Sequence, residues 1–281
     1  MKSTLFSLLA AIALLLAFSA TRTRQPENAA ASAPATSASV EPSNGPRVPV
    51  VVELFTSEGC SSCPPADALL MQLDQSSVPG AEVIALSEHV DYWNYIGWSD
   101  PFSSEAYSAR QQAYAQALRQ TGGRGDVYTP QMVVDGQFEF VGSNTAKARD
   151  VITQAAAFPK AEVKLTLINS EPSDSLKLRV QASQLPQLHA NDQAEVVLAI
   201  AENNLTSSVT RGENSGRKLR HTAVTRELRT LGQFAPAQKS FETETPIKLA
   251  AGWKRADLRL IAFIQERTNR RILGAASIKL N

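Results

Sequence analysis

The amino-acid sequence predicts an α/β domain followed by an antiparallel β-sandwich, and three observations support this fold class. The first is a nearly continuous apolar segment, VPVVVELFTS, which is typical of a strand buried on both faces. The second is a CxxC motif directly after it, followed by helical and strand patterns in turn. The third is a change after Pro159 to segments that alternate apolar and polar residues, as half-buried antiparallel strands do.

The elements of the first domain, residues 47–159, follow from their patterns in chain order. The segment PPADALLMQLDQ predicts a helix with four apolar residues on one face, Ala66, Leu69, Leu70 and Leu73. After it we expect a buried strand (AEVIALSEHV), a long helix from Asp100-Pro101 to Gly122-Gly123, a hairpin (YTPQMVVDGQFEFVG) with an Asp-Gly turn, and a helix over 144–158. This order is that of a thioredoxin-like fold with a helical insertion.

The second domain, residues 160–281, is predicted from its strand patterns. They occur in AEVKLTLINS, SLKLRVQAS, AEVVLAIAEN, SFETETPIKL, LRLIAFIQER and RILGAASIKL, with turn signals between them. Such a series is typical of a β-sandwich. The polar and basic stretch 203–233 predicts a long loop with a short helix, and its segment RGENSGRKLRH offers either an anion-binding site or a solvated loop.

The N-terminal segment predicts export from the cell. Lys2 precedes an apolar run over residues 5–18 and small residues follow, which is the order of a secretory signal peptide over residues 1–20. Residues 21–46 are rich in Ala, Ser, Pro and Thr and predict a disordered linker. We therefore expect a periplasmic or secreted protein in an oxidising compartment, which an uncleaved N-terminal segment would instead anchor in the inner membrane.

Composition excludes several classes of protein. The chain has 28 Lys plus Arg against 27 Asp plus Glu, without the basic face that a nucleic-acid binder carries. Only two cysteines are present, too few for a disulfide scaffold. Motifs for phosphate, dinucleotide or zinc-protease chemistry are missing from the sequence, so no cofactor and no metal are expected.

The two cysteines, Cys60 and Cys63, form the candidate catalytic pair. A helix N-terminus carries partial positive charge and lowers the pKa of a thiol placed there. Cys60 would attack a disulfide as a thiolate, and Cys63, one turn inward, would resolve the mixed disulfide. The alternatives are a structural disulfide, a copper site formed with His89, or an incidental pair on a partner-binding module.

Four further residues join the candidate site. Thr129-Pro130 precedes a predicted strand, and a cis-proline at that position in thioredoxin-like proteins lies against the CxxC pair, where it would present backbone to a substrate. Trp93 belongs to an aromatic segment after the second strand, and it lines either the site or the core. His89, at the end of that strand, is a candidate for proton transfer near the substrate or a hydrogen-bonded structural histidine.

Several long segments resemble a bacterial family known as domain of unknown function 1223. They are ELFTSEGCSSCPPAD, HVDYWNYIGWSDPF, SARQQAYA, VYTPQMVVDG and GENSGRKLRHTAVTREL. The resemblance implies an exported thioredoxin-like protein with Cys60 and Cys63 as redox pair and Pro130 as cis-proline, and it implies no substrate. The predicted function is a thiol–disulfide oxidoreductase acting on periplasmic protein thiols and disulfides with a redox partner. The alternative is a copper-binding or partner-binding module without redox turnover.

Overall fold

The computed structural model describes residues 47–170, 175–234 and 238–280. The predicted signal peptide and linker lie outside these ranges. None of the helices that the structure describes combines the length and the apolarity needed to cross a bilayer.

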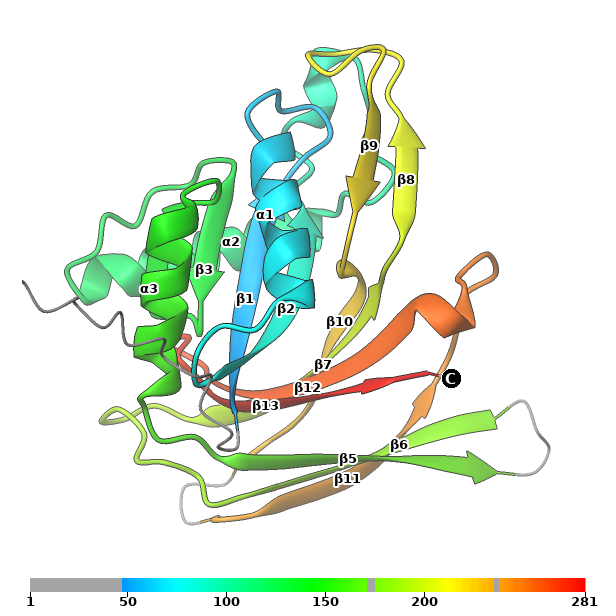
Figure 1. The fold of residues 1–281 in the computed structure, drawn as a ribbon. Helices are drawn as coiled ribbons and strands as arrows, with labels where there is room; N and C mark the ends of the chain where they lie inside the picture. The colour runs from blue at the N-terminus through cyan, green and yellow to red at the C-terminus, as the bar shows by residue number, and fades with distance from the viewer. Residues whose placement is uncertain (1–46, 171–174, 235–237, 281) are drawn as a thin grey trace, which may run out of the picture. The chain divides into compact units, whose positions relative to one another are not determined.

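The fold is built around a mixed sheet of eight strands in the order β13-β12-β7-β10-β2-β1-β3-β4 (Figure 1). β1 and β2 are parallel along their whole lengths, whereas β3 pairs antiparallel with β1 and β4 antiparallel with β3. The bounds are Val48–Thr56 (β1), Ala81–His89 (β2), Gln131–Val134 (β3), Phe138–Val141 (β4), Ala194–Glu202 (β7), Val224–Gln233 (β10), Leu258–Glu266 (β12) and Ile272–Lys279 (β13).

The sheet runs across the predicted domain boundary between residues 159 and 160. β10 adjoins β2 through the pair Val224 and Ser87, and the Ser87 amide donates to the Ala223 carbonyl over 2.7 Å. Strands from the two predicted domains therefore share one sheet, and the division into two domains stays a prediction.

Two smaller sheets complete the β structure. Glu162–Ser170 (β5), Ser175–Ser183 (β6) and Phe241–Ile247 (β11) form a sheet in the order β11-β6-β5, whose apolar side chains share a core with β7, β12 and β13. Leu205–Ser208 (β8) and Lys218–His221 (β9) form a two-stranded sheet. This hairpin lies beside the first helix in Figure 1 and carries residues of the candidate site.

The helices form where their apolar faces can be buried. Pro64–Gln75 (α1) and Thr145–Ala156 (α3) pack on the face of the sheet that carries Val52 and Leu54. Glu105–Gln120 (α2) buries Tyr114 and Leu118 against side chains of the opposite face. The two prolines occupy the first turn of α1, and the Ser104 side chain caps α2 by accepting from the Ala106 amide.

The predicted hairpin is confirmed as β3 and β4, and its turn needs glycine. Asp135 and Gly136 both have positive φ, 48° and 68°, as the two central residues of a type I′ turn do. A Cβ atom at Gly136 would lie 1.9 Å from the Arg270 carbonyl oxygen, so no side chain fits there. The turn is thereby held against the β12–β13 connection.

The prediction of a long loop with a short helix over residues 203–233 is wrong. This stretch forms β8, β9 and β10. In β9, exposed and buried residues alternate, and most side chains of β10 are only half-buried. Polar and basic residues therefore occur in regular strands here, and the low apolar content conceals the strand pattern.

Candidate functional site

The two cysteines lie where the chain passes from β1 into α1 and are joined in a disulfide. Their Cα atoms are 5.4 Å apart, and Cys63 is the residue directly before the first turn of α1. Both are buried, with 1% of Cys60 and none of Cys63 exposed. The residues between them, Ser61 and Ser62, are exposed, and the Ser62 hydroxyl oxygen lies 3.3 Å from Cys60 Sγ.

The Thr129–Pro130 peptide bond is cis, and Pro130 lies close to the first turn of α1. The relation is seen at Gly142, whose amide donates to the Pro130 carbonyl over 2.9 Å. A Cβ atom at Gly142 would lie 3.2 Å from the Cβ atoms of both Pro130 and Ala66. Pro130 and the residue three positions after Cys63 therefore flank the same glycine.

Trp93 and Thr129, two of the predicted substrate-binding residues, are in contact. The Trp93 indole donates to the Thr129 hydroxyl oxygen over 2.7 Å. The backbone of Gly59, directly before Cys60, is close to the same aromatic segment, because a Cβ atom there would lie 3.2 Å from Trp93 Cβ and Ile96 Cδ1. The aromatic segment thus joins the CxxC loop to the cis-proline loop.

His89, the third predicted substrate-binding residue, has no exposed surface. Its Nδ1 lies 2.7 Å from Asp100 Oδ2, and its ring packs edge-on against those of Phe102 and His221. Burial alone would lower the pKa of His89, but the adjacent Asp100 outweighs it and the pKa is raised. The structure places His89 beneath the site, so that contact with a substrate stays a prediction.

Glu58 links the CxxC loop to the β9 strand. The carboxylate is almost fully buried. It accepts from the Trp98 indole over 2.8 Å, and its other oxygen lies 3.0 Å from His221 Nε2. Glu58, His221, His89 and Asp100 therefore form a continuous buried cluster beneath the cysteines.

Asn214 is a site residue that sequence reasoning missed. It is fully buried, and its side-chain Nδ2 donates to the carbonyl oxygens of Glu58 and Cys60 over 2.9 Å each. Arg217 donates in turn to Asn214 Oδ1 over 2.8 Å. The neighbouring Glu213 accepts from the Ser61 amide over 2.9 Å. We name residues 211–217 the cap loop, because it holds the backbone of the CxxC loop.

Asp67 is a buried carboxyl on α1, one helical turn after Cys63. Its amide donates to the Cys63 carbonyl over 3.1 Å, and its Oδ1 atom has no hydrogen-bond partner among the described residues. Burial raises the pKa of Asp67, and the nearby His221 and His89 only partly offset this effect. The position and the raised pKa suit a group that exchanges a proton with Cys63.

The buried Asp67 carboxyl makes a testable contribution to pH-dependent stability. A carboxyl whose pKa is higher in the folded than in the unfolded state stabilises the fold below the unfolded pKa, and this contribution is lost as the pH rises through the folded pKa. Asp67→Asn removes that titration. We therefore expect the stability of the variant relative to wild type to increase from pH 4 to pH 7.

Denaturant unfolding of both oxidised proteins at several pH values between 4 and 7 measures this difference. Asp150→Asn, at an exposed site on α3, is the matched control and should leave the slope unchanged. Parallel curves for wild type and Asp67→Asn would contradict the assignment, whatever constant cost the asparagine adds.

The geometry required for the copper alternative is not found. In residues 47–170, 175–234 and 238–280, no three His, Cys, Asp or Glu side chains are arranged to hold a metal ion. Both sulfurs are committed to the disulfide, and His89 Nδ1 is committed to Asp100. The sequence residues proposed for copper thus have other partners here.

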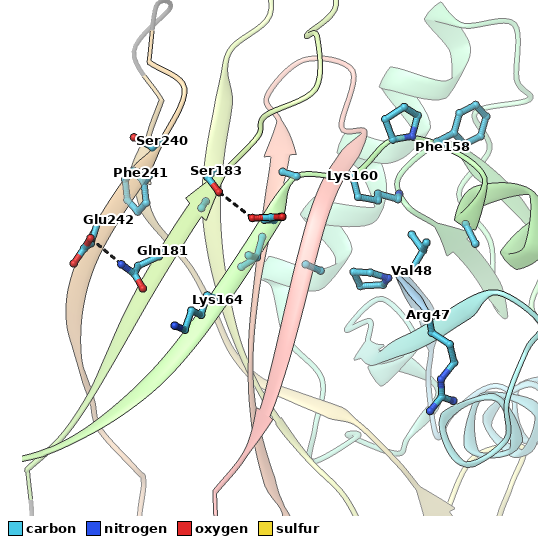
Figure 2. Close-up of a pocket in the computed structure, with 18 of the residues that line it drawn as sticks. Arg47, Val48, Phe158, Lys160, Lys164, Gln181, Ser183, Ser240, Phe241 and Glu242 are labelled. Carbon is cyan, nitrogen blue, oxygen red and sulfur yellow. Dashed lines mark hydrogen bonds between the residues drawn. The ribbon is translucent and has the colours of Figure 1, made fainter. Parts of the chain in front are cut away.

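A separate cavity of about 1200 Å³ lies away from the cysteines, between the start of β1, the α3–β5 connection and the three-stranded sheet (Figure 2). Its polar side chains are largely paired. Gln181 donates to Glu242 and Ser183 to Glu162, while Lys160 is bound to Asp135. None of the predicted site residues lines this cavity.

Comparison with known proteins supports one family. The model of the family described as "Protein of unknown function (DUF1223)" matches residues 51–265. The crystal structure of protein AGR_C_4864 from Agrobacterium tumefaciens is similar, with 27% identity, 84% of this chain and 96% of that chain covered, and a TM-score of 0.64. HBP35 of Porphyromonas gingivalis shares the fold at 20% identity, with 83% and 76% of the chains covered and a TM-score of 0.60. No curated protein matches the chain. Because the family model covers most of its length, the chain belongs to the DUF1223 family.

Proposed function

We propose that this protein is a thiol–disulfide oxidoreductase of an oxidising compartment and that Cys60 and Cys63 are its redox pair. The observation that carries the proposal is the Cys60–Cys63 disulfide at the start of α1, with the cis Thr129–Pro130 bond beside that helix. A purely structural bridge over so short a loop would add little stability, since the entropy removed from the unfolded chain is small.

A thioredoxin-like arrangement of the first part of the chain belongs to the same proposal. The strand order β2-β1-β3-β4, with α1 connecting the parallel pair and α3 following β4, supports it. In that arrangement the end of β1 places the CxxC loop at the N-terminus of α1, where partial positive charge stabilises a thiolate. The 16-residue helix α2 lies between β2 and β3, where the sequence predicts a long helix.

The chemistry is a two-step exchange. In the reduced protein, the Cys60 thiolate attacks one sulfur of a substrate disulfide, forms a mixed disulfide and expels the other substrate sulfur as a thiolate. Cys63 then gives up its proton, attacks Cys60 Sγ and releases the second substrate thiolate. Two electrons pass to the substrate and the Cys60–Cys63 disulfide is restored. The reverse sequence oxidises a substrate dithiol.

Individual residues of the site support these steps. Cys60 is assigned the attacking role because it precedes α1 in the CxxC loop and has a hydroxyl, that of Ser62, within 3.3 Å of its sulfur. Asp67 is assigned as the proton acceptor for Cys63 from its place one turn along α1. The Thr129 side chain, held by Trp93, keeps the backbone before Pro130 in place for an extended substrate.

The proposal is tested by trapping the mixed disulfide. Reduced Cys63→Ser protein should react with oxidised glutathione and accumulate an adduct on Cys60, because the resolving thiol is gone. Mass spectrometry of the intact protein detects the adduct. Cys60→Ser is the matched control and should react at least about tenfold more slowly, since the proposal assigns the attack to Cys60, whose sulfur has the Ser62 hydroxyl beside it. Equal rates for the two variants, or no adduct on either, would refute the assignment.

A further inference from the structure

A groove of about 390 Å³ runs along α1 beside the cysteine pair. One wall is α1, with Pro64 and Gln72, and the other is β9 with the end of the cap loop, including Arg217, Lys218 and Arg220. Pro64 directly follows Cys63, so one end of the groove lies next to the disulfide. The volume is in the range of sites that bind small molecules or short peptide segments.

Two cations, Lys218 and Arg220, line the β9 wall of the groove. Lys218 and Arg220 are exposed while Leu219 and His221 between and after them are buried, so the two cations project from the same face of the strand. Neither side chain makes an ion pair or hydrogen bond within the part of the chain that the structure describes. Unpaired cations along a groove attract an anionic partner.

The acids near the groove are already engaged or buried. Glu213 accepts from the Ser61 amide, and Asp74 pairs with Arg259 over 2.7 Å. Asp67 is buried at the floor, where burial raises its pKa and opposes its charge. The groove therefore presents net positive charge to any bound segment.

The backbone of β9 offers a second form of recognition. In the described residues β9 pairs with β8 only, and it lies between β8 and α1 (Figure 1). Its other edge thus faces the groove with main-chain groups that have no strand partner. Since α1 packs close to this edge, an extended segment would bind along the mouth of the groove rather than as a strand inserted between β9 and α1.

We propose that this groove binds an extended acidic segment of the redox partner, with two acidic residues separated by one residue. Alternate residues of a strand lie on one face, about 6.7 Å apart, which is also the spacing from Lys218 to Arg220. The inference rests on the proposed function, because a partner segment lying here would bring its neighbouring sulfur to Cys60.

The test measures binding without any redox chemistry. A fluorescein-labelled, cysteine-free peptide of sequence Thr-Glu-Val-Glu-Thr-Ser is titrated with the oxidised full chain and followed by fluorescence anisotropy. Lys218→Glu/Arg220→Glu should weaken binding about tenfold, as expected when two charge pairs are reversed. Arg217 is left intact because it holds Asn214. Lys147→Glu/Arg149→Glu, on the exposed face of α3, is the matched control and should bind like wild type.

Two further arms show whether the charges act as proposed. A peptide with Lys in place of both Glu residues should bind the Lys218→Glu/Arg220→Glu protein better than wild type, which also shows that the variant is folded. The isomer Thr-Val-Glu-Glu-Thr-Ser, whose acids point to opposite faces, should bind wild type more weakly. Equal binding to both double variants would overturn the proposal. The proposal would also be overturned if the protein bound phosphatidylglycerol vesicles more tightly than the peptide and the peptide did not displace the vesicles. Failure of the mixed-disulfide trap with retained peptide binding would instead refute the redox assignment alone.

Discussion

Asn214→Asp is expected to destabilise the oxidised protein by about 2–4 kcal/mol and to expose the disulfide to reductants. The substitution keeps the shape of the side chain but removes both hydrogens that Asn214 donates to the carbonyls of Glu58 and Cys60. Two buried carbonyl oxygens would then face a carboxylate, and the repulsion between these oxygens would add to the cost of the lost hydrogen bonds. The freed CxxC loop should allow dithiothreitol to reduce the native protein at least about tenfold faster, which corresponds to about 1.4 kcal/mol.

Denaturant unfolding measures the free energy of unfolding. The rate of disulfide reduction under native conditions measures how accessible the disulfide is to the reductant. Ser215→Ala, at an exposed neighbour in the cap loop, is the matched control, with an expected change within about 0.5 kcal/mol. If Asn214→Asp has the same free energy of unfolding as wild type and its disulfide is reduced at the same rate, the cap loop does not hold the CxxC loop in place.

Arg110→Met is expected to cost about 3–5 kcal/mol of folding free energy, because it leaves buried carboxyl groups without their cation. Arg110 on α2 is itself buried and donates to Glu53 Oε1 over 2.6 Å, to Gln265 over 3.0 Å and to the Tyr114 hydroxyl over 2.7 Å. Its Nε also lies 3.4 Å from Glu88. This single side chain therefore joins β1 and β2 to β12 through α2.

The pH dependence of this loss gives a second readout. Burial and the adjacent Glu53 raise the pKa of Glu88 well above its ordinary value. Without Arg110, protonation relieves both carboxyls, and the deficit should shrink as the pH falls from 7 to 4. Arg149→Met, on the exposed face of α3, serves as the control. A loss below about 1 kcal/mol at pH 7 would contradict a role for Arg110 in joining the strands.

The strands and helices near the cysteines could be predicted because apolar content and turn residues mark them clearly. VPVVVELFT and AEVIALSEH are the buried parallel strands β1 and β2, and the Asp135-Gly136 pair forms the hairpin turn. The CxxC spacing of Cys60 and Cys63 is also plain from local sequence, whereas the cis bond at Pro130 was expected from the resemblance to thioredoxin-like proteins.

The contacts that complete the site could not be predicted, because they join residues far apart in the chain. Asn214 lies more than 150 positions from the carbonyls that it binds, and nothing in the segment RGENSGRKLRH distinguishes a buried asparagine from a solvated one. His221 and Glu58 are separated by a similar number of positions in the chain. One usable signal of a buried network was present on α2. Three polar side chains lie on one face of this helix, which suggests either exposure or a buried network; they are Arg110, Gln111 and Tyr114.

The strands over 203–233 were missed for a related reason. Their side chains are half-exposed and polar. The alternation of apolar and polar residues is therefore too weak to distinguish these strands from a loop. The same stretch contributes Lys218 and Arg220, which line the groove along α1.

The most direct test of the redox assignment is the reduction potential of the Cys60–Cys63 disulfide. The full chain is equilibrated in glutathione and dithiothreitol buffers of graded potential, and the free thiols are alkylated and counted by mass spectrometry. We predict one reversible two-electron transition between about −120 and −270 mV, the range of thiol–disulfide oxidoreductases. A disulfide that stays closed to potentials below about −300 mV is structural, and that result would contradict a catalytic role for the pair.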